Sequence, residues 1–193
     1  LLQSDTIRTI GPIIRPSHVS DDTEKTIFTL GAGGQHDKES PEYHVDALLK
    51  HYVEAARILH EAGKKNLYLA KGPLMDVNLD LGHLQVLETM DLPDHFGPNT
   101  QVVTRGTYNI GWEAISSGAT LIATKRSATT FEYVNNRNQY LADQGYAYCA
   151  EMNGQALAEA VLRDRPKQLN KISTILNTCT ALEQIKSLVS EPL

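Results

Sequence analysis

Short apolar runs alternate with longer helical patterns along the chain, and this alternation limits the possible fold more than any other feature. Apolar and β-branched runs predict strands at Thr26–Leu30, Asn66–Ala70, His83–Leu87, Gln101–Thr104, Thr120–Ala123 and Tyr146–Ala150. Patterns of helical period predict helices at Pro41–Gly63, Asn109–Gly118, Phe131–Gln144, Gln155–Arg163 and Leu169–Val189, and a short helical turn at Met90–Phe96. Because such alternation requires right-handed crossovers, we expect an α/β fold with a doubly wound, mostly parallel, six-stranded Rossmann-like sheet.

The stretch Gln101–Gly118 reads as strand, turn, helix and stop, with Gly106 in the turn. Asn109 is expected to cap the helix, which directs the positive end of the helix dipole into the crevice beyond the strand and favours an anion there. One turn later, Glu113 is placed to accept hydrogen bonds from neutral hydroxyls beside a phosphate, and a solvated surface Glu is the alternative. Trp112 is expected to pack under the sheet.

Three turns fall on the edge of the sheet where its strands end: Gly31–Gln35, Arg105–Asn109 and Lys125–Thr130. Ligands of open parallel sheets bind at this edge. The glycines of the first turn let backbone N–H groups approach a phosphate, although a turn that only needs positive φ is the alternative. A dinucleotide fingerprint is not met, because the helix starts later, near Pro41, and Lys71 stands where an acidic residue is required.

Composition excludes several classes of protein. The net charge of -5 over 193 residues, with no Lys/Arg cluster on one face, disfavours a nucleic-acid surface. No apolar run approaches the roughly 18 residues of a membrane-spanning helix. The separated Cys149 and Cys179 fit reduced thiols in a cytoplasmic protein, and the seven histidines lack metal-ligand spacing, so neither a metal site nor a cofactor is expected.

The first 20 residues read as a linker entering a domain that covers residues 21–193. The chain has no initiator Met and opens in LLQSDTIRTIGPIIRP, which suggests a fragment of a longer, two-domain protein.

From Gly11 to about Arg163, the order of motifs resembles the carboxy-terminal donor-binding domain of GT-B glycosyltransferases, in particular the glycosyltransferase family 28 branch with the peptidoglycan UDP-N-acetylglucosamine transferase. The segment GPIIR resembles a linker motif, TLGAGGQ a phosphate loop and VLETM the segment that packs the nucleobase. TRGTYNIGWE is similar to S-R-x-G-x-x-T-x-x-E, and EYVNN is similar to E-x-x-x-N.

The resemblance implies a role for each matched position. Arg15 and the amides of the first loop approach the donor diphosphate, backbone near Val86 and Leu87 reads the base, Glu113 binds the ribose, and Glu132 and Asn136 face the sugar. The full set of candidate donor-binding residues is Arg15, Gly33, Gly34, Gln35, Leu87, Arg105, Thr107, Tyr108, Asn109, Glu113, Glu132 and Asn136. The chain departs from the motif where Thr107 replaces a glycine and Ile110 replaces a threonine, which leaves open a domain that keeps the fold without the activity.

The resemblance thus implies the nucleotide-sugar-binding half of a metal-independent hexosyltransferase with a UDP- or dTDP-linked donor. The expected partners are that donor and an absent N-terminal acceptor domain, without which the fragment binds but does not turn over; only that domain would touch a membrane. A nucleotide-sugar epimerase or hydrolase of the same fold, and a non-catalytic binding or interaction module, are the alternatives.

Overall fold

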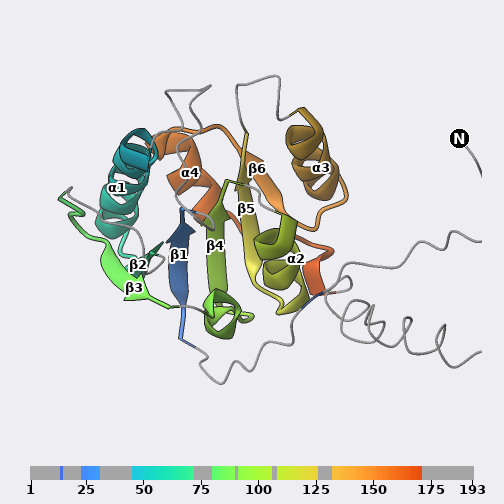
Figure 1. Ribbon diagram of the computed structural model, residues 1–193, viewed down its shortest axis with the longest axis horizontal. Helices are drawn as coiled ribbons and strands as arrows, with labels where there is room; N and C mark the ends of the chain where they lie inside the picture. The colour runs from blue at the N-terminus through green and yellow to red at the C-terminus, as the bar shows by residue number, and fades with distance from the viewer. Residues whose placement is uncertain are drawn as a thin grey trace, which may run out of the picture.

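The computed structural model describes residues 14, 23–30, 45–71, 80–89, 91–105, 108–125 and 132–170, with only the backbone for 132 and 133. Six strands form one sheet (Figure 1): β1 (Lys25–Thr29), β2 (Leu67–Lys71), β3 (Gln85–Glu88), β4 (Thr100–Thr104), β5 (Thr120–Thr124) and β6 (Tyr148–Ala150). Their order is β3-β2-β1-β4-β5-β6, and all five pairings are parallel. The expected six-stranded, doubly wound sheet is confirmed.

The helices follow the predicted segments closely. They are α1 (Val45–Glu61), the 3-10 helix η2 (Leu92–His95), α2 (Tyr108–Ser116), α3 (Glu132–Asp143) and α4 (Gly154–Val161). Gly118 and Gly145 have positive φ just after α2 and α3, which is the stop expected of glycine. The segment expected as a final helix lies outside the described residues beyond Asn170, and so does the linker apart from Ile14.

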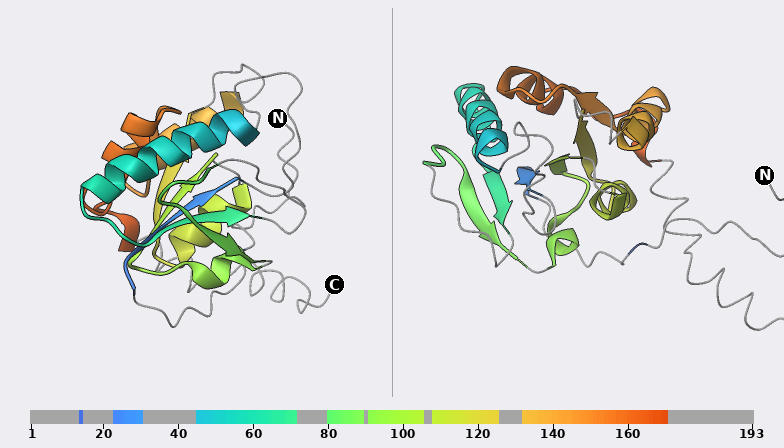
Figure 2. Two further views of the ribbon diagram at one scale, coloured as in Figure 1. Left: turned by 90° about the vertical axis from the view of Figure 1, so that its left-hand side faces the viewer. Right: turned by 45° about the horizontal axis from the view of Figure 1, so that its top comes forward.

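Each face of the sheet has its own hydrophobic core. On one face, α1 and α4 pack over Phe28, Leu69 and Ile122. On the other face, α2 packs over Ile27 and Val102, and α3 adds Leu141. Figure 2 shows α1 and α4 together on one side of the sheet and α2 on the other. Neighbouring residues of β1 serve opposite cores because successive strand side chains point to opposite faces.

The amino end of α4 is capped by Asn153, whose side chain accepts a hydrogen bond from the Ala156 amide at 2.8 Å. The helical pattern predicted a start at Gln155, one residue later than observed, and did not indicate the cap. A carboxamide three residues before an apolar-periodic segment was the available signal.

Candidate functional site

The carboxyl ends of β1 and β4 mark the switch point of the sheet, because the chain continues to β2 on one side and to β5 on the other (Figure 1). Phe28 pairs with Val103, so the next residues, Thr29 and Thr104, lie side by side on one face. Thr124 ends β5 on the opposite face. All three hydroxyls are buried and have no hydrogen-bond partner within the described residues. Sequence reasoning missed them, although a threonine at the end of three separate strands was visible.

Glu113 lies on α2, the helix that follows β4, and its side chain is buried, with the residue only 7% exposed. The alternative of a solvated surface carboxylate is therefore wrong. A buried carboxylate is stable only where donors or a neighbouring charge compensate it. Glu113 lies on the helix that follows β4 from the switch point, where carboxylate oxygens can also accept hydrogen bonds from hydroxyl donors of a ligand.

The amino end of α2 differs from the expectation in one respect. The helix begins at Tyr108, so Asn109 lies exposed in its first turn rather than at the cap. Tyr108 is half exposed, and its ring meets Trp112 edge-on at a centroid distance of 6.3 Å. Trp112 packs against the core on this face, which confirms its expected place, but its Nε1 is buried and lacks a partner among the described residues.

Behind the switch point, Tyr52 of α1 is fully buried and donates its hydroxyl hydrogen to the Thr29 carbonyl oxygen at 3.1 Å. Burial raises the pKa of this phenol, and the positive charge of Arg105 opposes the shift. Arg105, a predicted site residue, thus lies close enough to α1 to act on Tyr52 and is half-buried at the end of β4. The carboxyl end of β1 is thus hydrogen-bonded to α1 through this phenol.

The remaining predicted residues are spread more widely. Leu87 is on β3, next to Ala70 of β2, and is therefore two strands away from β1. Asn136 is exposed on α3, and Glu132 opens the same helix. Five candidates lie outside the described residues: Arg15, Gly33, Gly34, Gln35 and Thr107. The structure gathers Arg105, Tyr108, Asn109 and Glu113 around the ends of β4 and α2.

Two lysines at the carboxyl-terminal edge of the sheet form ion pairs. Lys125, the first residue of the predicted Lys125–Thr130 turn, lies 2.9 Å from Glu151, and that partner raises the pKa of the ammonium group. Lys71 lies 3.3 Å from Glu88. Within the described ranges, no group of three metal-ligating side chains occurs and no helix is long and apolar enough to cross a membrane.

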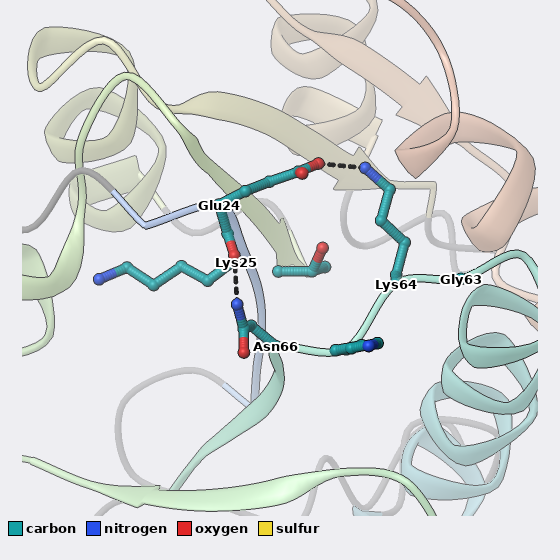
Figure 3. Close-up of a pocket in the computed structure, with 7 residues that line it drawn as sticks. Glu24, Lys25, Gly63, Lys64 and Asn66 are labelled. Atoms are coloured by element: carbon teal, nitrogen blue, oxygen red, sulfur yellow. Dashed lines mark hydrogen bonds and ion pairs between the residues drawn. The ribbon is translucent and has the colours of Figure 1, made fainter.

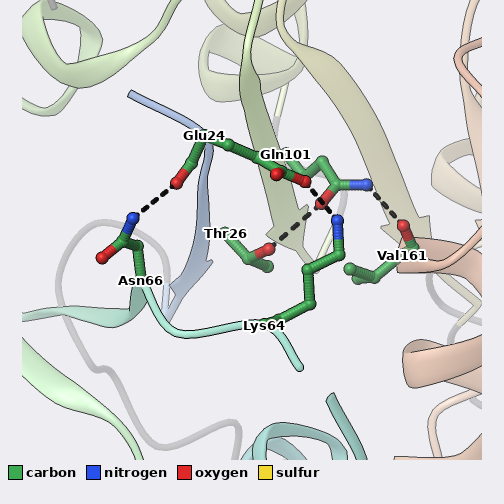
Figure 4. A network of polar contacts seen from close by, with 6 residues as sticks. All are labelled: Glu24, Thr26, Lys64, Asn66, Gln101 and Val161. Carbon is green, nitrogen blue, oxygen red and sulfur yellow. Dashed lines mark hydrogen bonds and ion pairs between the residues drawn. The ribbon is translucent and has the colours of Figure 1, made fainter. Parts of the chain in front are cut away.

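A cavity of about 220 Å³ opens at the opposite, amino-terminal edge of the sheet (Figure 3). It is lined by Glu24, Lys25, Thr26, Gly63, Lys64, Lys65 and Asn66. The polar contacts beside it tie secondary-structure elements together (Figure 4): Thr26 donates to Gln101 at 3.1 Å, and Gln101 donates to the Val161 carbonyl oxygen at 2.5 Å. Glu24 is paired with Lys64. This edge holds β1, β4 and α4 together and lies away from the switch point.

Comparison with known proteins gives the fold a precedent. No family model matches the chain, and no curated protein matches its sequence. Among solved structures, the glycotransferase of kitacinnamycin is similar with a TM-score of 0.66 and 17% identity, over 94% of this chain and 48% of that one. CalG4, the calicheamicin glycosyltransferase, gives 0.63 and 14%, over 94% and 47%. Arabidopsis thaliana UGT89C1, complexed with UDP-L-rhamnose, gives 0.53 and 15%, over 94% and 48%.

The TM-scores of 0.53 to 0.66 establish a shared fold, and identities of 14–17% establish nothing beyond it. The chain spans about half the length of the solved structures that it matches. It therefore has the Rossmann-like fold of GT-B glycosyltransferases, as the resemblance in its sequence implied.

Proposed function

We propose that this chain is the donor-binding half of a metal-independent glycosyltransferase that transfers a hexosyl group from a UDP- or dTDP-linked sugar to an acceptor. The observation that carries the proposal is the buried carboxylate of Glu113 on the helix that starts beside the switch point. A carboxylate withdrawn from water there is suited to accept hydrogen bonds from the two ribose hydroxyls of a nucleotide.

The surroundings of Glu113 fit the rest of such a ligand. Arg105 supplies a positive charge at the end of β4, and the amino end of α2 adds its dipole next to it. The hydroxyls of Thr29 and Thr104 add buried groups that can donate to phosphate or sugar oxygens. The complex of the similar UGT89C1 with UDP-L-rhamnose supports a nucleotide sugar as the ligand class.

In the reaction, the bond between the anomeric carbon of the sugar and the terminal phosphate oxygen breaks, and an acceptor oxygen forms the new bond to that carbon. The bonding electrons leave on the diphosphate, whose growing charge is stabilised by Arg105, the α2 dipole, Arg15 and the amides of Gly33 and Gly34. The acceptor proton passes to a base on another domain. Because that base lies on another domain, we expect the 193-residue chain to bind the donor without transferring its sugar.

A thermal-shift panel tests the ligand class. UDP or dTDP at about 100 times its Kd should stabilise the chain by roughly 2.7 kcal/mol, which corresponds to a rise in Tm of about 5–11 °C. NAD and ATP at the same concentration should give smaller shifts, because the Gly31–Gln35 turn lacks dinucleotide spacing and the arrangement of two loops suits a short diphosphate. A larger shift with NAD would contradict the proposal, and no shift with any nucleotide would favour an interaction module.

Arg15 provides a second arm of the test. Because its proposed contact is to charge, Arg15→Ala should weaken binding of UDP more than binding of uridine. Equal losses for both ligands would remove Arg15 from the site. Product analysis with the full-length protein then separates a transferase, which makes a glycoside, from an epimerase or hydrolase.

A further inference from the structure

Arg137 of α3 reaches across to the amino end of α2. Its guanidinium carbon lies 5.5 Å from the centre of the Tyr108 ring, and Tyr108 is the first residue of α2. The same guanidinium donates from Nη2 to Oδ1 of Asn138 at 3.3 Å. A cation is therefore held at the end of a helix where the dipole is already positive, an arrangement that an anion stabilises.

The side chains around this cation are rich in hydrogen-bond donors. Asn138 is 1% exposed, and its Nδ2 has no acceptor within the described part of the chain. Trp112 meets the Tyr108 ring from one turn further along α2, and its Nε1 is likewise buried without an acceptor. Buried donors are normally paired, so the unpaired Nδ2 of Asn138, whose Oδ1 contacts the guanidinium, indicates a ligand that brings acceptor oxygens. The unpaired Nε1 of Trp112, whose ring meets that of Tyr108, adds a second donor.

We propose that Arg137, held in place by stacking on Tyr108, is a further anion-binding residue of this site and contacts the diphosphate of the donor. This inference rests on the function proposed above and adds a residue from α3 that the sequence motifs did not indicate. A guanidinium suits the role because its planar donors match phosphate oxygens, while its face packs on an aromatic ring.

The chain offers a matched control in Arg163. Its guanidinium carbon also lies 5.5 Å from the centre of a tyrosine ring, that of Tyr148, which opens β6 at the amino-terminal edge of the sheet, away from the switch point. Arg137→Met and Arg163→Met thus remove the same charge and the same type of ring contact, but only the first removes a cation from the amino end of α2.

The experiment is a titration of the 193-residue chain and both variants with UDP, UMP and uridine, with circular dichroism to check folding. Arg137→Met should lower UDP affinity about tenfold or more, UMP affinity less, and uridine affinity less than about twofold. Arg163→Met should bind all three ligands like the wild type. If Arg137→Met leaves the ratio of UDP to uridine affinity unchanged, the inference is wrong while the proposed function stands.

Two further outcomes are decisive. If the wild type binds neither UDP nor uridine, the proposed function fails and the role of Arg137 fails with it. If Arg137→Met does not fold, Arg137→Lys is measured instead: it keeps the charge but loses the planar fork, so UDP affinity should fall several-fold with uridine affinity unchanged. Wild-type UDP affinity in Arg137→Lys would overturn the inference.

Discussion

Removal of one buried hydroxyl tests the packing behind the switch point. Tyr52 is fully buried, its ring centroid lies 5.0 Å from that of Phe28, and its hydroxyl donates to the Thr29 carbonyl oxygen. Tyr52→Phe keeps the ring and its contacts but deprives the carbonyl of this donor. The free energy of unfolding should fall by about 1–3 kcal/mol, the usual cost of leaving a buried polar group without its partner.

Urea unfolding followed by circular dichroism measures this loss, and Tyr140→Phe is the control. Tyr140 is 59% exposed on α3, so removal of its hydroxyl should change the free energy of unfolding by less than about 0.5 kcal/mol. In a thermal scan, the Tyr52→Phe loss corresponds to a decrease in Tm of roughly 2–12 °C. Equal, near-zero losses in the two variants would refute the assignment of this hydrogen bond.

The same phenol predicts a pH dependence. Burial raises its pKa in the folded state above the unfolded value of 10.0, so the folded state holds its proton more tightly. The stability that the buried, protonated phenol contributes is fully present below pH 10.0 and is lost as the pH rises above that value, because the unfolded state then releases the proton first. Stability should therefore decline less steeply above that pH in Tyr52→Phe than in the wild type.

Two other predictions concern packing and a thiol. A Cβ added at Gly154 lies 2.5 Å from Cγ of Glu54, so Gly154→Ala should destabilise the contact between α1 and α4 by about 1–3 kcal/mol in urea unfolding. Gly111→Ala, whose added Cβ has its nearest contact at 3.6 Å, should cost nothing, and equal effects would contradict the close approach of the two helices. Burial raises the pKa of the Cys149 thiol. In a Cys179→Ser background, this thiol should therefore react with a disulfide reagent at about pH 8 several-fold more slowly in the folded protein than in the unfolded protein. Equal rates in the two states would exclude a protected thiol.

Local patterns were enough to predict the elements of this fold. The predicted strand Thr26–Leu30 agrees with β1 to within one residue at each end. The agreement is close because its apolar residues are bounded by charged residues on one side and by glycine on the other. Glycines also marked the ends of α2 and α3. The pairing of the strands could not be predicted in this way. The register of Lys25 with Thr100 joins segments that are far apart in the sequence, and no local pattern encodes their contacts.

Site residues were harder to predict than the elements that carry them. Asn109 is a good capping residue, yet α2 starts one residue earlier, and capping preference alone does not fix a boundary at this precision. The burial of Glu113 depends on which side of α2 packs against the sheet. In the sequence, the position of Arg137 is typical of a solvated helix residue. Only the fold shows that its guanidinium lies over the Tyr108 ring.

The central claim, a nucleotide bound through its ribose by Glu113, is tested most directly by calorimetric titration of wild type and Glu113→Gln. The ligands are UDP and an analogue that lacks both ribose hydroxyls. Each charge-assisted hydrogen bond contributes about 1.5–3 kcal/mol, so the substitution should lower UDP affinity at least about tenfold and remove most of the preference for UDP over the analogue, with the fold unchanged by circular dichroism. Wild-type UDP affinity in Glu113→Gln, or an equal loss for both ligands, would contradict the account.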